Sequence, residues 1–144
     1  MQNRSVPCDT VLPHVVYEDV DAAIDWLTHT LGFREHFRYG EPTQGAQLLL
    51  GRACIMVRSA RADSASPGAL GKWTQSVTIY LDDVDAHCAA ARAAGAAIER
   101  EPWETEYGER VYHVKDPFGH SWEFSQHVRD VAPQEWGAKV KVTR

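Results

Sequence analysis

The run HVKDPFGHSWEFSQH, residues 113–127, decides the fold because it predicts a tight hairpin between two strands. In the turn Asp116-Pro117-Phe118-Gly119, proline fixes φ at the second position and glycine suits the fourth position of a type I turn. Successive side chains of a strand point to opposite faces of the sheet. One face of the hairpin therefore carries apolar residues suited to packing under helices: Tyr112, Val114, Trp122 and Phe124.

The opposite face of the hairpin is mostly polar and allows two interpretations. It carries Val111, His113, Lys115, Ser121, Glu123, Ser125 and His127. An antiparallel sheet commonly leaves one face in water, which would explain these residues without any function. Alternatively, a strongly curved sheet closes around a ligand, since pockets combine apolar and aromatic walls with a few polar groups. Bulky residues predicted on the polar side and its loops favour the cavity, namely Leu12, Met56, Tyr80 and Tyr107.

The chain contains a weak internal repeat, which predicts its architecture. VVYEDVDAAIDWL and TIYLDDVDAHCAA share a strand, an acidic junction and a helix, so Asp19–Ala22 correspond to Asp83–Ala86. The acidic residues suit helix N-termini, where they accept amide hydrogens and meet the positive end of the helix dipole. Helices are expected at Val20–Leu31 and Val84–Ala94, with Gly32 and Gly95 as stops.

The sequence of each half therefore predicts a βαβββ module. Two such modules indicate an α+β protein with a curved, mostly antiparallel β-cup flanked by helices. The expected strands are Val11–Tyr17, Phe33–Tyr39, Gln47–Leu50 and Ala53–Arg58, then Val77–Leu81, Ala97–Trp103, Arg110–Lys115 and Ser121–His127. We expect a single domain over residues 1–144, with module 1 at about 10–58 and module 2 at about 75–128. The Gly/Pro-containing linker, 59–74, is expected to be a mobile connector unless a ligand or partner orders it. The C-terminal tail, 129–144, is expected to be a solvated extension with Pro133 in a first helical turn.

Composition excludes several classes of protein. The chain has 144 residues, 16.1 kDa and a net charge of −5, which gives no electrostatic reason to bind nucleic acid or an anionic membrane. The chain has three cysteines, an odd number without CxxC spacing: Cys8, Cys54 and Cys88. Neither a disulfide framework nor a zinc knuckle is therefore indicated. The first residues lack an apolar signal region, and no apolar run approaches the ~20 residues of a membrane span. We expect a cytoplasmic protein with reduced thiols.

The acidic junctions EDVDAAIDWL and LDDVDAHCAAARAAG, together with YGERVYHVKDPFGHSWEF, resemble the vicinal oxygen chelate superfamily. This superfamily includes glyoxalase I, extradiol dioxygenases and the bleomycin- and fosfomycin-resistance proteins. The resemblance runs from about Val11 to Val128 and is greatest to a glyoxalase-like branch that carries a DPFGH turn. It implies the paired-module fold and a homodimer, whereas activity does not follow from fold. Open strand edges also favour dimerisation.

Metal-dependent members of this superfamily place one ligand on each of four strands. Carried over position by position, these sites fall on Leu12, Ser76, Met56 (or Ile55) and Glu123. Only Glu123 matches, and one carboxylate with water would hold a divalent ion weakly. The resemblance therefore implies a protein without a metal cofactor. One divalent metal held at a displaced site by His14, His113 and Glu123 remains an alternative.

The candidate ligand-binding residues are His14, Met56, Ser76, Thr78, Trp103, Tyr107, Arg110, His113 and Glu123. Glu123 is expected to accept hydrogen bonds from a ligand, or to be a structural remnant bonded to Ser76, Thr78 or His113. Trp103, Tyr107 and Arg110 precede the hairpin, where resistance proteins of the superfamily build a ligand wall; Trp103 could equally pad a dimer contact.

Three functions follow from this pattern. The first is metal-independent binding of a small molecule, for sequestration or carriage. The second is a metal-dependent lyase, transferase or dioxygenase with relocated ligands. The third is a metal-free isomerase or hydrolase, in which Glu123 and His113 would be the catalytic pair.

Overall fold

The computed structural model describes residues 3–6 and 11–142, and each half of the chain follows the order strand, helix, strand, strand, strand. The first half comprises β1 (His14–Tyr17), α1 (Val20–Leu31), β2 (Arg34–Tyr39), β3 (Gly45–Leu50) and β4 (Ala53–Ser59). The second comprises β5 (Ser76–Tyr80), α3 (Val84–Ala93), β6 (Ile98–Glu104), β7 (Glu109–Lys115) and β8 (Ser121–His127). A short helix α2 (Pro67–Leu70) lies between the halves, and a 3-10 turn η1 (Pro133–Trp136) lies in the tail. The predicted α+β fold of two βαβββ modules is confirmed.

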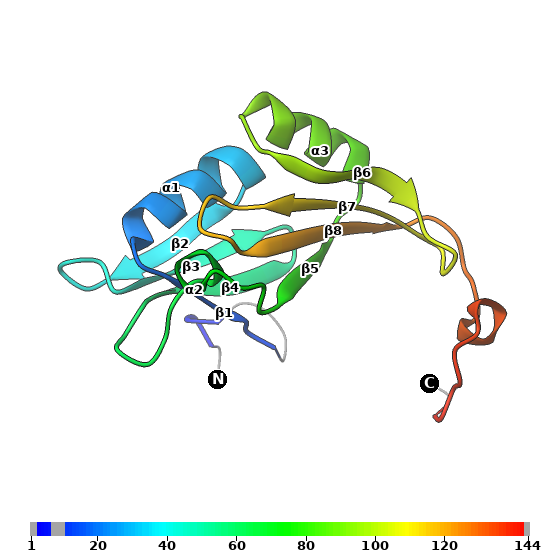
Figure 1. The fold of residues 1–144 in the computed structure, drawn as a ribbon, viewed down its shortest axis with the longest axis horizontal. Helices are drawn as coiled ribbons and strands as arrows, with labels where there is room; N and C mark the ends of the chain where they lie inside the picture. The colour runs from blue at the N-terminus through cyan, green and yellow to red at the C-terminus, as the bar shows by residue number, and fades with distance from the viewer. Residues whose placement is uncertain (1–2, 7–10, 143–144) are drawn as a thin grey trace.

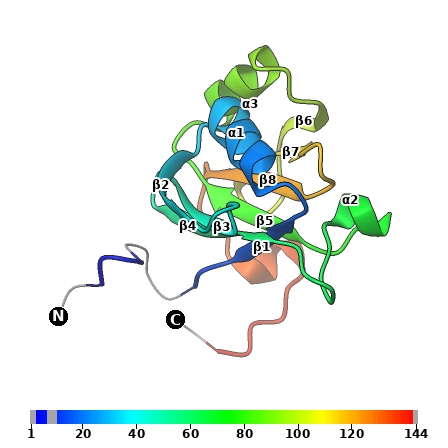
Figure 2. The ribbon, with the colours of Figure 1, turned by 90° about the vertical axis from the view of Figure 1, so that its left-hand side faces the viewer.

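The strands form two four-stranded sheets with equivalent topology, β1-β4-β3-β2 and β5-β8-β7-β6. The first strand of each module pairs in parallel with the last, and the other pairings are antiparallel. Helices α1 and α3 contact each other and lie on the same side of the molecule (Figures 1 and 2). Each sheet thus has one face under a helix and one face turned away from it.

The two long helices begin and end through local capping. Asp19 accepts a hydrogen bond from the amide of Ala22 at 3.0 Å, and Asp83 accepts one from Ala86 at 2.9 Å. Gly32 ends α1 at φ 75°, a left-handed conformation that glycine adopts without steric cost. Helix α3 ends one residue earlier than the sequence predicted, because Ala94 already serves as the C-cap.

The helix-facing sides of both sheets share one hydrophobic core. It includes Val15, Tyr17, Leu48, Ile55 and Val57 from the first sheet, and Ile79, Tyr112, Val114, Trp122 and Phe124 from the second. The apolar face predicted for the hairpin is therefore confirmed. The rings of Phe33 and Trp122 meet edge to face at 5.5 Å between centroids, so side chains of one module pack directly on the other. Cys54 and Cys88 are also buried, whereas Cys8 lies outside the described residues.

The carboxylate of Asp116 joins the two modules. It is 3% exposed and accepts two backbone hydrogen bonds at 3.0 Å, from Phe118 and His120, which close the hairpin turn. Its other oxygen accepts hydrogen bonds from the Tyr17 hydroxyl at 2.7 Å and the Trp122 indole at 3.1 Å. Burial, and then the charge of Asp116, raise the pKa of Tyr17 well above its usual value, so this hydroxyl remains a donor. The His120 imidazole also reaches the first module, at 2.7 Å from the carbonyl of Val16.

The connector is held against the same turn, which the sequence analysis did not predict. The amide of Gly68 in α2 donates to the carbonyl of Phe118 at 2.8 Å, and the amide of Ser66 donates to Glu18 at 2.8 Å. A Cβ on Gly68 would lie 2.5 Å from the Phe118 oxygen, and one on Gly119 would lie 2.4 Å from the Gly68 nitrogen. Two glycines therefore permit this close backbone contact, a tertiary effect without a local pattern in sequence. Within residues 3–6 and 11–142, no helix is long and apolar enough to span a membrane.

His87 on α3 makes a second hydrogen-bonded contact between the two modules. Its Nε2 lies 2.8 Å from the carbonyl of Leu31 at the end of α1, and its Nδ1 lies 2.6 Å from the hydroxyl of Tyr112. A carbonyl oxygen can only accept, so Nε2 carries the proton and Nδ1 accepts from the tyrosine. Burial lowers the pKa of His87, so the folded protein holds this imidazole in its neutral form.

We predict that Asp116→Asn lowers the free energy of unfolding by about 2–4 kcal/mol, because an amide nitrogen cannot accept hydrogen bonds from the donors that surround it. Urea denaturation followed by circular dichroism measures this loss. Asp63→Asn, on the exposed part of the connector, is the matched control and should leave stability unchanged. Equal stability of the two variants would show that the Asp116 contacts contribute little.

We also predict that acidification destabilises the fold through His87. The unfolded chain takes up a proton near the ordinary histidine pKa of about 6.5, whereas the folded chain does so only at lower pH. Stability should therefore fall as pH drops below about 6.5. Urea titrations between pH 8 and pH 5 should show a smaller decrease in His87→Gln than in wild type. His29→Gln, at an exposed position of α1, should keep the wild-type slope; an unaltered slope in His87→Gln would contradict the prediction.

Candidate functional site

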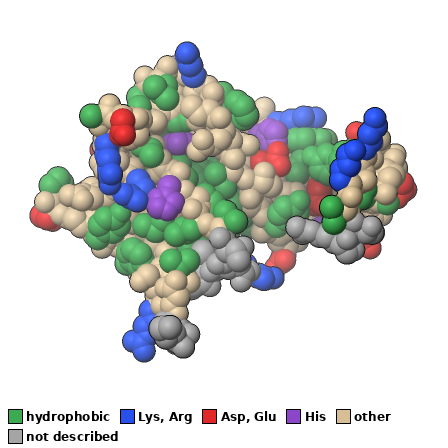
Figure 3. Space-filling view, turned by 90° about the horizontal axis from the view of Figure 1, so that it is seen from below, with side chains coloured by type: hydrophobic (Ala, Val, Ile, Leu, Met, Phe, Trp, Pro, Cys, Tyr) green, Lys and Arg blue, Asp and Glu red, His purple; other side chains and the backbone are tan. Residues whose placement is uncertain are grey.

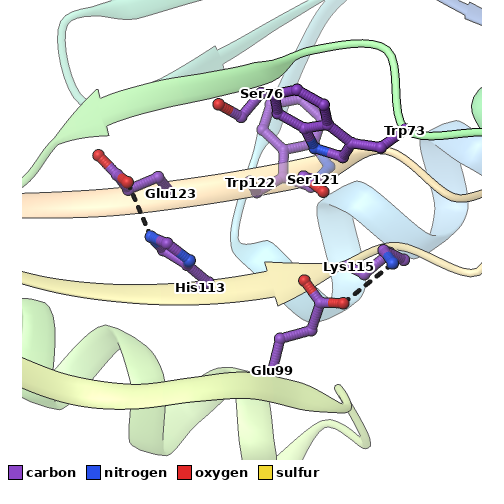
Figure 4. A pocket seen from close by; sticks show the side chains of 8 residues that line it. All are labelled: Trp73, Ser76, Glu99, His113, Lys115, Ser121, Trp122 and Glu123. Atoms are coloured by element: carbon purple, nitrogen blue, oxygen red, sulfur yellow. Dashed lines mark hydrogen bonds and ion pairs between the residues drawn. The ribbon is translucent and has the colours of Figure 1, made fainter.

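A cavity of about 290 Å³ opens on the face of the second sheet that is turned away from α3 (Figure 4). His113 and Lys115 reach it from β7, Ser121 and Glu123 from β8, and Ser76 from β5, as strand alternation requires. Three further residues complete the lining, namely Trp73 from the connector, Glu99 from β6 and Trp122. On the side opposite the helices, hydrophobic atoms lie between histidine and charged side chains (Figure 3).

A row of side chains beside this cavity crosses all four strands of the sheet. The Thr78 hydroxyl donates to Glu123 at 3.1 Å, and the other oxygen of Glu123 lies 2.7 Å from Nε2 of His113. The His113 ring meets the edge of Trp103 at 5.1 Å between centroids. The guanidinium of Arg100 lies 3.4 Å above the centre of the Trp103 ring, a cation–π contact that fixes the indole.

The contact of His113 with Glu123 fixes the chemistry of the imidazole. Because the carboxylate accepts from Nε2, the neutral ring keeps its proton there and leaves Nδ1 as an acceptor. Among the described residues, Nδ1 has no hydrogen-bond partner. A carboxylate that orients an imidazole is the arrangement that general bases use.

A second ion pair crosses the same cavity. Lys115 Nζ lies 3.0 Å from Glu99, and the two side chains are 46% and 40% exposed. Exposed ion pairs contribute only about 0–1 kcal/mol, so either group can exchange its partner for a ligand at little cost. The cavity therefore offers a cation from Lys115 and acceptors from Glu99 and Glu123.

The structure brings five of the predicted site residues together. Ser76, His113 and Glu123 line the cavity, whereas Thr78 and Trp103 contact its polar groups directly. One of the two interpretations of Glu123 was a structural residue bonded to Ser76, Thr78 or His113; the structure has its bonds to Thr78 and His113.

Four predicted site residues lie elsewhere. His14 and Met56 are register partners in β1 and β4 of the first sheet, and neither lines the cavity. Tyr107 lies in the turn between β6 and β7, where its ring contacts Trp136 of the tail at 5.7 Å. Arg110 pairs with Asp85 of α3 at 2.8 Å, because alternation places it on the helix side together with Tyr112.

Five lining residues were absent from the predicted set, and one of them, Trp122, was expected only on the core face of the hairpin. Alternation along the hairpin had placed Lys115 and Ser121 on the correct face, so their position was available from sequence. Glu99 lies on β6 next to a register irregularity, which disturbs the alternation. Trp73 lies near the end of the connector, whose sequence has no periodicity, and its approach to the cavity depends on the tertiary contact of α2.

The positions that match the metal ligands of the superfamily do not suit a divalent ion in this chain. Met56 and Ser76 offer a thioether and a hydroxyl, Leu12 offers no ligand atom, and Glu123 is already bonded to Thr78 and His113. Divalent cations bind tightly only where several oxygen or nitrogen ligands converge.

Comparison with known proteins agrees with this architecture. A sequence model of the Glyoxalase/Bleomycin resistance protein/Dioxygenase superfamily matches residues 10–124. The uncharacterized protein Mb0911c of Mycobacterium bovis is 30% identical over 131 residues, 85% of this chain and 86% of that protein. The crystal structure of TioX from Micromonospora sp. ML1 shares 32% identity at a TM-score of 0.70, over 83% of this chain and 99% of TioX. Lactoylglutathione lyase from Agrobacterium tumefaciens, at 21% identity and a TM-score of 0.62 over 83% of this chain and 94% of that one, shares the fold alone.

Two βαβββ modules that share one core and leave a polar sheet face open define an α+β protein of the paired-module type. The chain belongs to the Glyoxalase/Bleomycin resistance protein/Dioxygenase superfamily, as the resemblance of its hairpin and acidic junctions implied.

Proposed function

We propose that this protein binds a small molecule on the polar face of the second sheet, without a metal, and acts by sequestration or carriage in the cytoplasm. The observation that carries the proposal is the cavity itself, in which paired charged groups lie beside an unusually exposed tryptophan. Ligand sites typically combine an aromatic wall with a few polar groups that orient the ligand.

The exposure of Trp73 favours a ligand that has a flat apolar part. The residue is 68% exposed at the rim of the cavity, although tryptophan is highly buried on average in folded proteins. Covering about 100 Å² of its apolar surface would contribute about 2.5 kcal/mol. Stacking on the indole face would add to this term.

The polar groups support a ligand that carries charge or hydrogen-bonding groups next to its flat part. Lys115 can exchange Glu99 for an anionic group of the ligand, and Glu123 can accept from a donor. Metal independence is supported by the residue types at the positions that match the superfamily's ligands, where Leu12 and Met56 replace oxygen and nitrogen donors.

Proton transfer is a second candidate function, favoured by one distance. The 2.7 Å contact between His113 and Glu123 leaves Nδ1 as an acceptor beside the cavity, suited to removing a proton from a bound molecule. A metal-free isomerase or hydrolase would use this pair, and both functions would share the binding residues.

We predict that a ligand from a library of planar metabolites and antibiotics raises the melting temperature by several degrees. A ligand at 100 times its dissociation constant adds ~2.7 kcal/mol of stability. Trp73→Ala should then weaken binding by about tenfold or more, measured by isothermal titration calorimetry, since the aromatic wall is lost. Trp136→Ala is the control. It removes an aromatic residue of the tail, which contacts Tyr107 and not the cavity, and this variant should bind the ligand with wild-type affinity.

The same ligand separates the two candidate functions. Binding alone predicts that Glu123→Gln changes affinity while the ligand is recovered unaltered. Conversion of the ligand by wild type, lost in both Glu123→Gln and His113→Gln, would establish the proton-transfer function instead. Unchanged affinity in Trp73→Ala would place the ligand outside this cavity.

We propose further that the protein is a homodimer in which a second copy completes the binding site. Within the described residues, the wall of the cavity comes from the second sheet and the connector, and the first sheet contributes nothing to it. The resemblance implies a cup built from two modules, so the missing wall would come from the first module of a partner. Strands β1 and β5 lie at sheet edges and offer backbone groups for such an association.

We predict a dimer at micromolar concentration, measured by size-exclusion chromatography with light scattering. Mixing two full-length variants, each impaired on a different module, tests the shared wall. Trp73→Ala and Met56→Ala chains should bind the ligand better as a mixture than either variant alone, because mixed dimers regain one intact site. A monomeric protein with full ligand affinity would refute the dimer.

A further inference from the structure

The first sheet buries a glutamine on the face turned away from α1. Gln47 of β3 is 0% exposed, and its register partners are Met56 on β4 and Phe37 on β2. Burying a primary amide is costly unless its donors and acceptor are satisfied. The partners of this side chain therefore indicate what the surface is built to hold.

Gln47 is bonded on both sides. Its Oε1 lies 2.6 Å from Nδ1 of His36, and its Nε2 donates to the backbone carbonyl of Ser5 at 2.7 Å and contacts the sulfur of Met56 at 3.7 Å. A carbonyl only accepts, so the NH2 group must face Ser5 and the oxygen must face a protonated Nδ1 of His36. The histidine thus orients the amide, which presents donors outward from the sheet.

The carbonyl that Gln47 binds belongs to residues 3–6, here called the N-terminal segment, which lies outside every helix and strand. The side chain of Asn3 accepts from the amides of Ser5 and Val6, both at 3.1 Å, and so holds the segment in a turn. Residues 3–5 are exposed and Val6 is only half-buried. Among residues 3–6 and 11–142, the bond to Gln47 is the side-chain hydrogen bond that joins the segment to the sheet, and one hydrogen bond contributes modest net stability.

We propose that this face of the first sheet recognises a peptide or amide carbonyl of a ligand, and that the N-terminal segment occupies this position when no ligand is bound. Gln47 is the residue that recognises the carbonyl, and His36 is a positioning residue that orients it. A ligand enters by replacing the carbonyl of Ser5. Within one chain this face does not line the cavity on the second sheet. Its meeting with a partner's cavity rests on the dimer proposed above, whereas the test below reads the Gln47 side chain directly, so failure of this inference and failure of the proposed function are distinguishable.

The test uses the blocked tetrapeptide acetyl-Asn-Arg-Ser-Val-amide as the probe and ¹H–¹⁵N correlation spectra of the full chain. In Asn3→Ala, the turn is lost, so the amide resonances of Ser5 and Val6 should move toward random-coil positions and the Gln47 NH2 resonances should shift. The probe should shift the same NH2 resonances, with an affinity at least fivefold higher for Asn3→Ala than for wild type, because the internal competitor is weakened. Asn3→Asp keeps the acceptor oxygen and should match wild type.

Gln47→Met combined with Asn3→Ala should abolish probe binding, since the donor is removed while the side chain keeps a similar length. His36→Ala in the same background provides a second test that leaves Gln47 in place, and it should weaken probe binding several-fold. The proposal is overturned if Asn3→Ala leaves the Gln47 NH2 resonances unchanged. It is equally overturned if millimolar probe does not shift those resonances in the Asn3→Ala protein.

Discussion

The buried carboxylate of Asp116 is the interaction on which the arrangement of this protein depends. One of its oxygens closes the turn between β7 and β8, and the other receives donors from Tyr17 in the first module and Trp122 in the second. A single side chain thus fixes a local turn and the contact between modules. The same turn also accepts a hydrogen bond from the backbone of α2. This contact positions the connector so that Trp73 lies at the cavity.

Much of the fold could be predicted because its determinants are local. Asp19 and Asp83 cap their helices, the DPFG turn specifies a hairpin, and alternation assigns Tyr112 and Trp122 to the core. Each of these signals extends over a few residues and needs no knowledge of distant contacts. The short helix α2 has local signals of its own, namely Ser66 as N-cap, Pro67 in the first turn and Gly71 as C-cap. Its contact with the hairpin turn, which Gly68 and Gly119 permit, has no such local pattern.

The candidate site was predictable only where strand alternation applied. His113 and Glu123 follow from the hairpin, whereas Arg110 was assigned to the ligand wall although the same alternation places it with Tyr112 on the helix side. His14 and Met56 lie on the first sheet and Glu123 on the second, so neither of the first two lines the cavity within one chain. Sequence showed that both modules have a polar face, but the relative position of the two faces depends on how the modules pack through their shared core.

The close contact of Gly68 with Gly119 restricts how the connector can vary. Neither position has room for a methyl group, so residues from Ser66 to Trp73 must keep their length and path if the tryptophan is to stay at the cavity. Residues 61–63 are exposed and lie outside the helices and strands, so this part of the connector can tolerate insertions, deletions or a fused epitope. Under the proposed function, replacing Trp73 at the end of this fixed segment would alter ligand preference, whereas a change in the length of the exposed loop before it would not.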